Sequence, residues 1–191
     1  MIKGRDLLIY FAIKYKGSSR KILDAIQSKE CPSLDEVEKA VQSVKSKVVT
    51  VLDEEYPKVL FQINATAFVL FYDGDISVIS DYTRCVSVVG SRTLLPYEVK
   101  NLNTIMDQLG DKVTIISGLA IGADSLAQRR ALQNGAKVVA VLGNGIDICY
   151  PLENYDLYEM IKEKGLIISE YPGKTETFPE NFLIRNRRNI I

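Results

Sequence analysis

The sequence predicts an α/β protein with a Rossmann-like, doubly wound and mainly parallel sheet, preceded by a small N-terminal helical domain. Short, apolar and mostly β-branched runs recur at 86–89, 113–116, 138–142 and 166–168. Helical stretches lie between them, at about 97–109, 122–134 and 154–164. Such runs are typical of parallel strands covered on both faces. Glycine closely follows three of them, as in repeated strand–turn–helix units.

Residues 1–47 lack this alternation, and we expect two domains, 1–47 and 48–191. Leu7, Leu8, Phe11 and Tyr15 recur at helical spacing. The 17–19 segment interrupts the helix with glycine, and a serine there can cap a second helix. Pro32-Ser33 starts a third helix. We expect packing or partner contact, rather than catalysis, from this helical domain.

The 48–80 segment is expected to form strands. A β-branched run at 48–52 predicts one strand, and the apolar run at 67–72 predicts a second. Asp73-Gly74-Asp75 suits a hairpin turn, after which residues 76–79 would return as a third strand.

Composition limits the chemistry. The sequence has 24 basic and 24 acidic residues, so a polyanion site must be a local patch. It has no histidine and three scattered cysteines, which excludes Ser-His-Asp and Cys-His catalysis and disfavours zinc or disulfides. With no P-loop or dinucleotide fingerprint, we expect no cofactor and no enzyme. We also expect no membrane association and a cytoplasmic location, since no signal peptide or long apolar run is present.

The turns after the strands carry the candidate site, because ligands of such sheets bind beyond the carboxyl ends of the strands. Glycines there let the backbone approach a phosphate, and the amides of the next helix point at it. Arg92 adds a planar cation, and Ser91 and Ser117 add hydroxyl donors. The candidate phosphate-binding residues in these turns are Gly90, Ser91, Arg92, Ser117, Gly118, Gly122, Gly143 and Gly145.

Further residues are assigned to the same site. Asp124 either interacts with the dipole of its helix or positions the 118–122 loop by accepting its amides. Ser169 and Glu170, after the last strand, are expected to support the pocket. The basic run that contains Arg185, Asn186 and Arg187 is either a solvated helix face or tail, or a segment that folds back over the site.

The order of motifs along the chain resembles the DprA (Smf) family, over about residues 50–191. The series begins with Val88-Val89-Gly90-Ser91-Arg92 and Ser117-Gly118-Leu119-Ala120-x-Gly122-x-Asp124. It continues with Val141-Leu142-Gly143-x-Gly145-Ile146-Asp147, Tyr150-Pro151, Asn154, Gly165-Leu166-Ile167-Ile168-Ser169-Glu170 and Phe182 with Arg185-Asn186-Arg187. Each motif is short, and the combination in this order is specific.

The resemblance implies a non-catalytic protein that binds single-stranded DNA and helps load RecA onto it, notably in natural transformation, with a possible homodimer. Gly90, Ser91 and Arg92 would line a phosphate pocket. Ser117, Gly118 and Gly122 would shape it, and the Arg185-Asn186-Arg187 run would close it. Backbone contacts of this kind give little sequence preference and strong salt dependence.

The chain departs from the family pattern at three positions and in length. The family usually has a basic residue where Ile121 stands, a histidine where Gln128 stands, and often a basic residue where Leu152 stands. Two missing cations predict weaker contact with phosphates. The family also continues beyond the Arg-Asn-Arg motif, and we expect that missing part to supply the rest of the sheet and much of the dimer and RecA surfaces.

Two other functions stay open from the sequence. One is a nucleotide-binding Rossmann-like enzyme or sensor, for which Pro172-Gly173-Lys174-Thr175 is the nearest match to a phosphate loop. The other is an inactive truncated paralogue.

Overall fold

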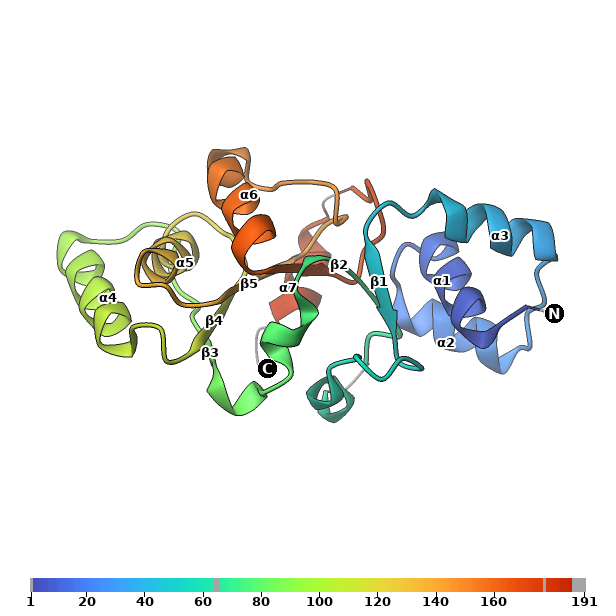
Figure 1. The fold of residues 1–191 in the computed structure, drawn as a ribbon. Coiled ribbons are helices and arrows are strands. Elements are labelled where there is room, and N and C mark those ends of the chain that lie inside the picture. The colour runs from blue at the N-terminus through green and yellow to red at the C-terminus, as the bar shows by residue number, and fades with distance from the viewer. Residues whose placement is uncertain (1, 64–65, 177, 187–191) are drawn as a thin grey trace.

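The computed structural model describes residues 2–63, 66–176 and 178–186. Six strands form one sheet in the order β1-β2-β6-β5-β4-β3 (Figure 1). The strands are β1 Lys47–Thr50, β2 Val69–Gly74, β3 Cys85–Ser87, β4 Thr114–Ser117, β5 Val138–Leu142 and β6 Leu166–Ser169. The helices are α1 Gly4–Lys14, α2 Ser19–Gln27, α3 Leu34–Ser43, α4 Pro96–Leu109, α5 Ala123–Gln133, α6 Tyr155–Lys164 and α7 Pro179–Asn186. Within the described ranges, no helix is long and apolar enough to cross a bilayer.

The four strands β3 to β6 pair in parallel, which confirms the α/β class and the mainly parallel sheet. They follow one another across the sheet in chain order. Right-handed crossovers therefore place α4, α5 and α6 on the same face, as Figure 1 shows, so these four strands are wound in one direction and not doubly as expected. The opposite face is covered by the chain around Ile79, which packs on Ile116 and Val139. Both faces of the central strands are thus buried, as their apolar sequences require.

The expected return strand at 76–79 is wrong. Asp73 and Gly74 do not turn but continue β2, where they pair with Ile167 and Leu166 of β6 in antiparallel register. Residues 76–79 form a 3-10 turn instead, started by the Asp75 carboxylate, which accepts the Ser77 N–H. With β1 on one side of β2 and β6 on the other, no edge of β2 remains for a returning strand.

The three expected N-terminal helices are present. Ser33 begins α3 with a capping box, in which its hydroxyl accepts the Glu36 N–H and the Glu36 carboxylate accepts the Ser33 N–H. Ser18 occupies the N-cap position of α2, but its side chain makes no capping hydrogen bond, so the expected cap is only positional.

The helical region shares a hydrophobic core with the sheet. Phe11 of α1, Val37 of α3 and Phe71 of β2 belong to one buried cluster with the residues under α5 and α6. Gly17 packs against the Glu170 carbonyl so closely that a Cβ atom there would overlap it. The two parts on either side of residue 47 therefore pack against each other through this shared core. A division into two domains at residue 47 remains a proposal.

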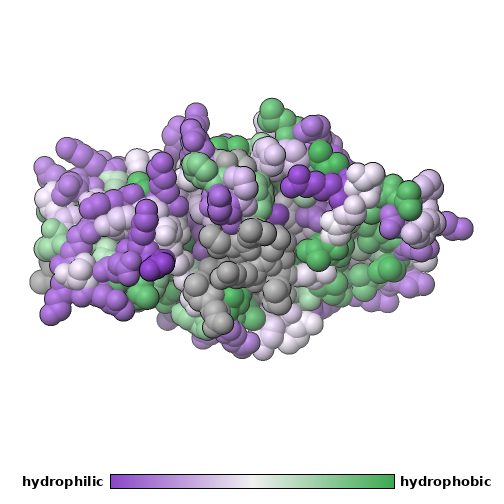
Figure 2. Space-filling model, turned by 180° about the vertical axis from the view of Figure 1, so that it is seen from behind, coloured by the Kyte–Doolittle hydropathy of each residue, from purple (hydrophilic) through white to green (hydrophobic). Residues whose placement is uncertain are grey.

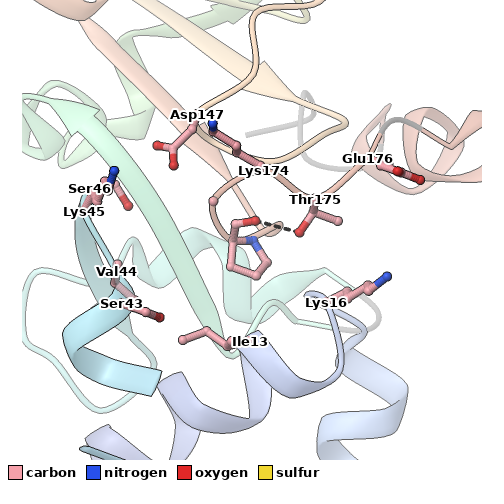
Figure 3. A pocket seen from close by; sticks show the side chains of 12 residues that line it. Ile13, Lys16, Ser43, Val44, Lys45, Ser46, Asp147, Lys174, Thr175 and Glu176 are labelled. Carbon is pink, nitrogen blue, oxygen red and sulfur yellow. Dashed lines mark hydrogen bonds between the residues drawn. The ribbon is translucent and has the colours of Figure 1, made fainter. Parts of the chain in front are cut away.

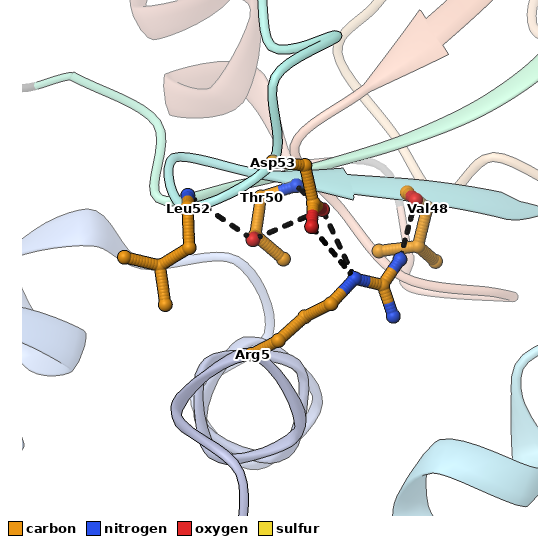
Figure 4. A network of polar contacts seen from close by, with 5 residues as sticks. All are labelled: Arg5, Val48, Thr50, Leu52 and Asp53. Carbon is orange, nitrogen blue, oxygen red and sulfur yellow. Dashed lines mark hydrogen bonds and ion pairs between the residues drawn. The ribbon is translucent and has the colours of Figure 1, made fainter.

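A polar network fastens α1 to the first strand (Figure 4). Arg5 donates to both carboxylate oxygens of Asp53 at 3.0 Å and to the Val48 carbonyl at 2.9 Å. Asp53 also accepts the Thr50 N–H at 2.8 Å. Partial burial raises the pKa of Asp53, but the hydrogen bonds from Thr50 and Arg5 outweigh it and hold that pKa below its ordinary value.

The molecular surface differs between the two ends of the sheet. Figure 2 shows mostly hydrophilic side chains over the N-terminal helices, whereas hydrophobic ones gather towards the end formed by α4 and the edge strand β3. The exposed large apolar residues of the β3–α4 segment are Val89, Leu95, Tyr97 and Ile105. The edge strand therefore leaves an apolar surface uncovered within the described residues.

Replacing Asp53 with Asn tests the network. We expect the free energy of unfolding at pH 7 to fall by about 1 kcal/mol, because Arg5 loses its charged acceptor and the pair is only partly buried. The folded-state pKa of Asp53 lies below the unfolded value, so this contribution is present above about pH 4 and disappears as the pH falls through the folded pKa. Urea unfolding at pH 7 and pH 3 measures both effects.

Glu54→Gln is the matched control, since Glu54 is exposed and makes no ion pair within the described residues. An equal loss of stability in both variants, or a loss in Asp53→Asn that is the same at the two pH values, would contradict the role of the network.

Candidate functional site

The turn at 90–92 lies directly against the start of α5. The Ser91 carbonyl accepts the Ala123 N–H at 3.0 Å, and a Cβ atom at Gly90 would come within 2.6 Å of the Ala123 Cβ. Gly122 has a φ of +93°, and a Cβ atom there would overlap the Ser91 carbonyl. Only glycine meets both conditions at 122. The close fit leaves the Arg92 side chain exposed at the carboxyl ends of β3 and β4.

The two serines of the candidate site differ in position. Ser91 is exposed, and its hydroxyl donates to the Thr93 carbonyl at 2.7 Å and accepts the Thr93 N–H at 3.1 Å. Ser117 is fully buried, and its hydroxyl donates to the Val88 carbonyl at 2.6 Å. This corrects the expectation that Ser117 offers a donor to an anion. It shapes the site from beneath by joining β4 to the end of β3.

Asp124 positions the loop that follows β4. Its side chain is buried, and its carboxylate accepts the Gly118 N–H at 3.0 Å. Of the two interpretations left open by the sequence, this geometry supports the one in which Asp124 holds the 118–122 loop through its amides. The negative charge lies beneath the loop rather than on the open surface.

Two residues of the motifs that resemble the family, neither of which the sequence assigned to the site, complete the loop. Leu119 is fully buried with a φ of +60°, a backbone conformation that leucine rarely adopts. The buried Asn154, at the start of α6, donates from its side-chain amide to the Leu119 carbonyl at 2.9 Å. The surrounding packing and this hydrogen bond hold the strained loop in place. Neither contact follows from local sequence spacing, because 35 residues separate the partners.

The described part of the C-terminal basic run, Arg185 and Asn186, lies in α7, which folds back over the site. Arg185 is 6% exposed, and its guanidinium donates to the Val141 carbonyl at 2.7 Å. It lies so close to Gly118 that a Cβ atom there would overlap it. Burial lowers the pKa of Arg185, an effect that the nearby Asp124 opposes and Arg92 reinforces. Asn186 ends α7, and Arg187 lies outside the described residues.

These elements surround a pocket of about 320 Å³, which we call the Arg92 pocket. Its lining residues are Arg92, Gly118, Ala120, Ile121, Tyr150, Pro151, Leu152, Glu153, Phe182 and Arg185. Leu152 is 74% exposed and Ile121 is 43% exposed, so the two positions where the family resemblance leads us to expect cations form an apolar rim here. The Tyr150 and Phe182 rings lie 5.7 Å apart, and Arg185 lies over the Phe182 ring. The pocket combines guanidinium groups with an aromatic and aliphatic wall.

The other two predicted glycines, Gly143 and Gly145, do not line this pocket. A Cβ atom at Gly143 would come within 2.7 Å of the Phe182 ring, so the glycine at this position lets α7 pack closely on the loop after β5. Gly145 faces the 173–175 loop, and its N–H donates to the Thr175 carbonyl at 2.9 Å. The Gly145 amide is therefore committed within the fold, and this predicted phosphate-binding residue does not line the Arg92 pocket.

The expected supporting residues at the end of β6, Ser169 and Glu170, contact the interior rather than the pocket. The Ser169 hydroxyl donates to the Asn144 carbonyl at 2.6 Å and accepts the Tyr171 N–H at 2.9 Å. The Glu170 backbone faces Gly17, away from the Arg92 pocket.

Gln128, where the family usually has a histidine, is fully buried and donates to the Val139 carbonyl at 3.0 Å. In the parts of the chain that the structure covers, no group of three or more Cys, Asp or Glu side chains is arranged to hold a metal ion.

Comparison with known proteins gives a consistent result. Residues 47–190 match the model of the family described as DNA recombination-mediator protein A. DNA processing protein DprA of Streptococcus pneumoniae is 36% identical over 138 residues, which are 72% of this chain and 48% of that protein. Protein Smf of Synechocystis is also 36% identical over 138 residues, 71% of this chain and 35% of that protein. The chain thus spans about half or less of these curated relatives.

Two solved structures share the fold. The crystal structure of DprA from Streptococcus pneumoniae superposes with a TM-score of 0.71 at 27% identity, covering 96% of this chain and 69% of that one. DNA processing protein A from Helicobacter pylori, whose structure was studied for its single-stranded DNA binding mode, gives a TM-score of 0.67 at 25% identity, covering 78% of this chain and 66% of that one.

The contact between Gly122 and the Ser91 carbonyl can be tested by substitution. We expect Gly122→Ala to lower the free energy of unfolding by about 3 kcal/mol or more, since it adds a backbone clash to the cost of a positive φ. Gly135→Ala is the matched control, because Gly135 has a φ of +80° but open space around it, and we expect it to cost about 1–2 kcal/mol. Chemical denaturation measures both. Equal losses of stability in Gly122→Ala and Gly135→Ala would contradict the close packing of the 90–92 turn against the start of α5.

Proposed function

Because the chain belongs to the family of DNA recombination-mediator protein A, we propose that it binds single-stranded DNA in the Arg92 pocket and acts in recombination without catalysing a reaction. The observation that carries the proposal is the pairing of Arg92 and Arg185 with the apolar wall of Tyr150, Leu152 and Phe182. A guanidinium suits a phosphate, and an aromatic or aliphatic surface suits the face of a base.

The chemistry of the pocket favours an unpaired strand over a duplex. In a duplex the base faces are stacked and only the base edges are reached through the grooves. In a single strand every base presents a face, so an apolar wall gains contact with any sequence. The proposed site therefore binds with little sequence preference, through phosphate contacts that salt weakens.

The Helicobacter pylori relative supports this choice of ligand, since its structure was studied for its binding of single-stranded DNA. Loading of RecA, a role in natural transformation and formation of a homodimer are finer proposals. They rest on the family alone, because the chain spans about half of its curated relatives. This role would place the chain in the cytoplasm, together with RecA and incoming DNA.

Removal of the Arg92 side chain is the first test. We expect Arg92→Ala to weaken binding of a fluorescein-labelled oligo(dT) about tenfold at low salt, because one phosphate loses its charged partner. Fluorescence anisotropy over a salt series should also show a shallower dependence of affinity on salt, by about 0.7 in the logarithmic slope. The Arg84→Ala control removes an exposed cation before β3, at the opposite edge of the sheet, and we expect it to leave binding unchanged.

Three outcomes separate the possible functions. Equal affinity of the Arg92→Ala and unmodified proteins would contradict the proposed pocket. Stabilisation by a mononucleotide in a thermal-shift assay, without binding of oligo(dT), would favour a small-molecule site instead. Absence of both would contradict any anion-binding role for the pocket.

Restoring a cation at the rim is a second test. We expect Leu152→Lys to strengthen oligo(dT) binding several-fold at low salt and to steepen the salt dependence by about 0.7, since it adds one phosphate contact. Leu152 is 74% exposed, so the change should not affect folding. Leu52→Lys is the matched control, because Leu52 is 63% exposed and lies outside the Arg92 pocket. Equal gains from both variants would indicate nonspecific attraction rather than a contact at the rim.

A further inference from the structure

A second pocket lies between the N-terminal helices and the loops that follow β5 and β6 (Figure 3). We call it the lysine pocket, and its volume is about 440 Å³. Lys16 reaches it from the turn after α1, Lys45 from the connection between α3 and β1, and Lys174 from the loop after β6. Ile13, Val44 and Pro172 add apolar surface. Three separate chain segments thus bring cations to one cavity.

The three lysines are exposed, and none forms an ion pair within the described ranges. This distinguishes them from Lys14, which pairs with Glu30 at 2.7 Å, and from Lys162, which pairs with Asp73 at 3.1 Å. The pocket also contains Asp147 and Glu176, which offset part of the positive charge. The three lysines can therefore pair with the phosphates of a polyanion, while the two carboxylates repel them.

The walls of the lysine pocket are held firmly. Thr175 binds the Pro172 carbonyl with its N–H at 3.1 Å and with its hydroxyl at 2.6 Å, a contact drawn in Figure 3. The Gly173 carbonyl accepts the Asp147 N–H at 3.0 Å, which ties the loop after β6 to the loop after β5. On the opposite wall, the Ser46 hydroxyl is buried and has no hydrogen-bond partner among the described residues. A ligand oxygen would meet a preformed cavity there.

Both pockets lie along one edge of the sheet. The Arg92 pocket is formed by loops after β3, β4 and β5, and the lysine pocket by loops after β5 and β6. All four strands are parallel, so these loops share the carboxyl edge. Adjacent strands are about 4.8 Å apart, which places β4 and β6 about 10 Å from each other. A strand of nucleic acid a few nucleotides long can follow that edge from one pocket to the next.

From this placement we propose that single-stranded DNA bound at the Arg92 pocket continues along the carboxyl edge into the lysine pocket, where Lys16, Lys45 and Lys174 contact its phosphates. The inference rests on the proposed function and extends it to the N-terminal helices. It gives those helices a direct role in binding DNA, in addition to packing. Lys16 and Lys45 also follow the carboxyl ends of α1 and α3, where a cation stabilises the helix dipole, and the experiment has to separate that effect.

The test compares two triple variants with equal loss of charge. Lys16→Ala/Lys45→Ala/Lys174→Ala removes the cations of the lysine pocket. Lys112→Ala/Lys137→Ala/Lys164→Ala is the control, because these exposed lysines precede β4, β5 and β6 and so lie at the opposite edge. Anisotropy with oligo(dT) of about 4 to 16 nucleotides, the range of single-strand site sizes, measures affinity against length and salt.

For the unmodified protein we expect affinity to rise with length until both pockets are filled. The lysine-pocket variant should bind the longest oligonucleotide about tenfold or more weakly, with a salt slope lower by about 2 for three lost phosphate contacts. Its affinity for the shortest oligonucleotide, and that of the control variant at every length, should be unchanged. Asp147→Asn should strengthen binding of the long oligonucleotide only, because it removes an opposing charge from the pocket.

Thermal melting shows whether the lysines act through the helices alone. A lower melting temperature with unchanged binding of the long oligonucleotide would overturn the inference, while a continued effect of Arg92→Ala would leave the proposed function standing. If the unmodified protein binds no oligonucleotide of any length, the proposed function and the inference fall together.

Discussion

The buried guanidinium of Arg185 is the interaction on which the candidate site depends. A charge taken out of water is costly unless polar groups surround it. Here the guanidinium donates to the Val141 carbonyl and lies near the Asp124 carboxylate. It occupies the space that a side chain at position 118 would fill. Because Arg185 belongs to α7, its placement carries Phe182 to the edge of the Arg92 pocket. The Asp124 carboxylate also accepts the Gly118 N–H, so the same group orders the 118–122 loop and interacts with the charge of Arg185.

The fold brings the loops of the candidate site to one edge of the sheet, the edge that we propose binds DNA. Consecutive parallel strands bring all their carboxyl-terminal loops to one side, and the close fit of Gly122 and Ser91 joins the first two of those loops. The helices α1 and α3 share the hydrophobic core of the sheet and are further fixed by Arg5 and Asp53. The ends of these helices, which Lys16 and Lys45 follow, are therefore packed against the sheet rather than joined to it by a linker alone.

Much of the fold was predictable because its signal is local. The apolar runs, the glycines after them and the Ser33 cap each specify a short segment, and the parallel strands formed as expected. The expected strand at 76–79 did not form, because strand pairing depends on residues far apart in the sequence and β6 pairs with that edge of β2. In the site, spacing placed Arg92 and the Gly118 loop at the strand ends. Spacing could not reveal that Ser117 and Gly145 are committed inside the fold, or that Asn154 supports Leu119, since these contacts depend on tertiary packing.

Single-stranded DNA that follows the carboxyl edge of the sheet must touch the loops of several strands at once. Amide NMR of the labelled chain, titrated with oligo(dT), tests this residue by residue. We expect the resonances of residues 90–92, 118–122 and 173–176 to shift with a common saturation curve. Shifts confined to the opposite edge, at 111–113 and 135–137, or the absence of any shift in the 90–92 and 118–122 loops on saturation, would contradict binding along the carboxyl edge.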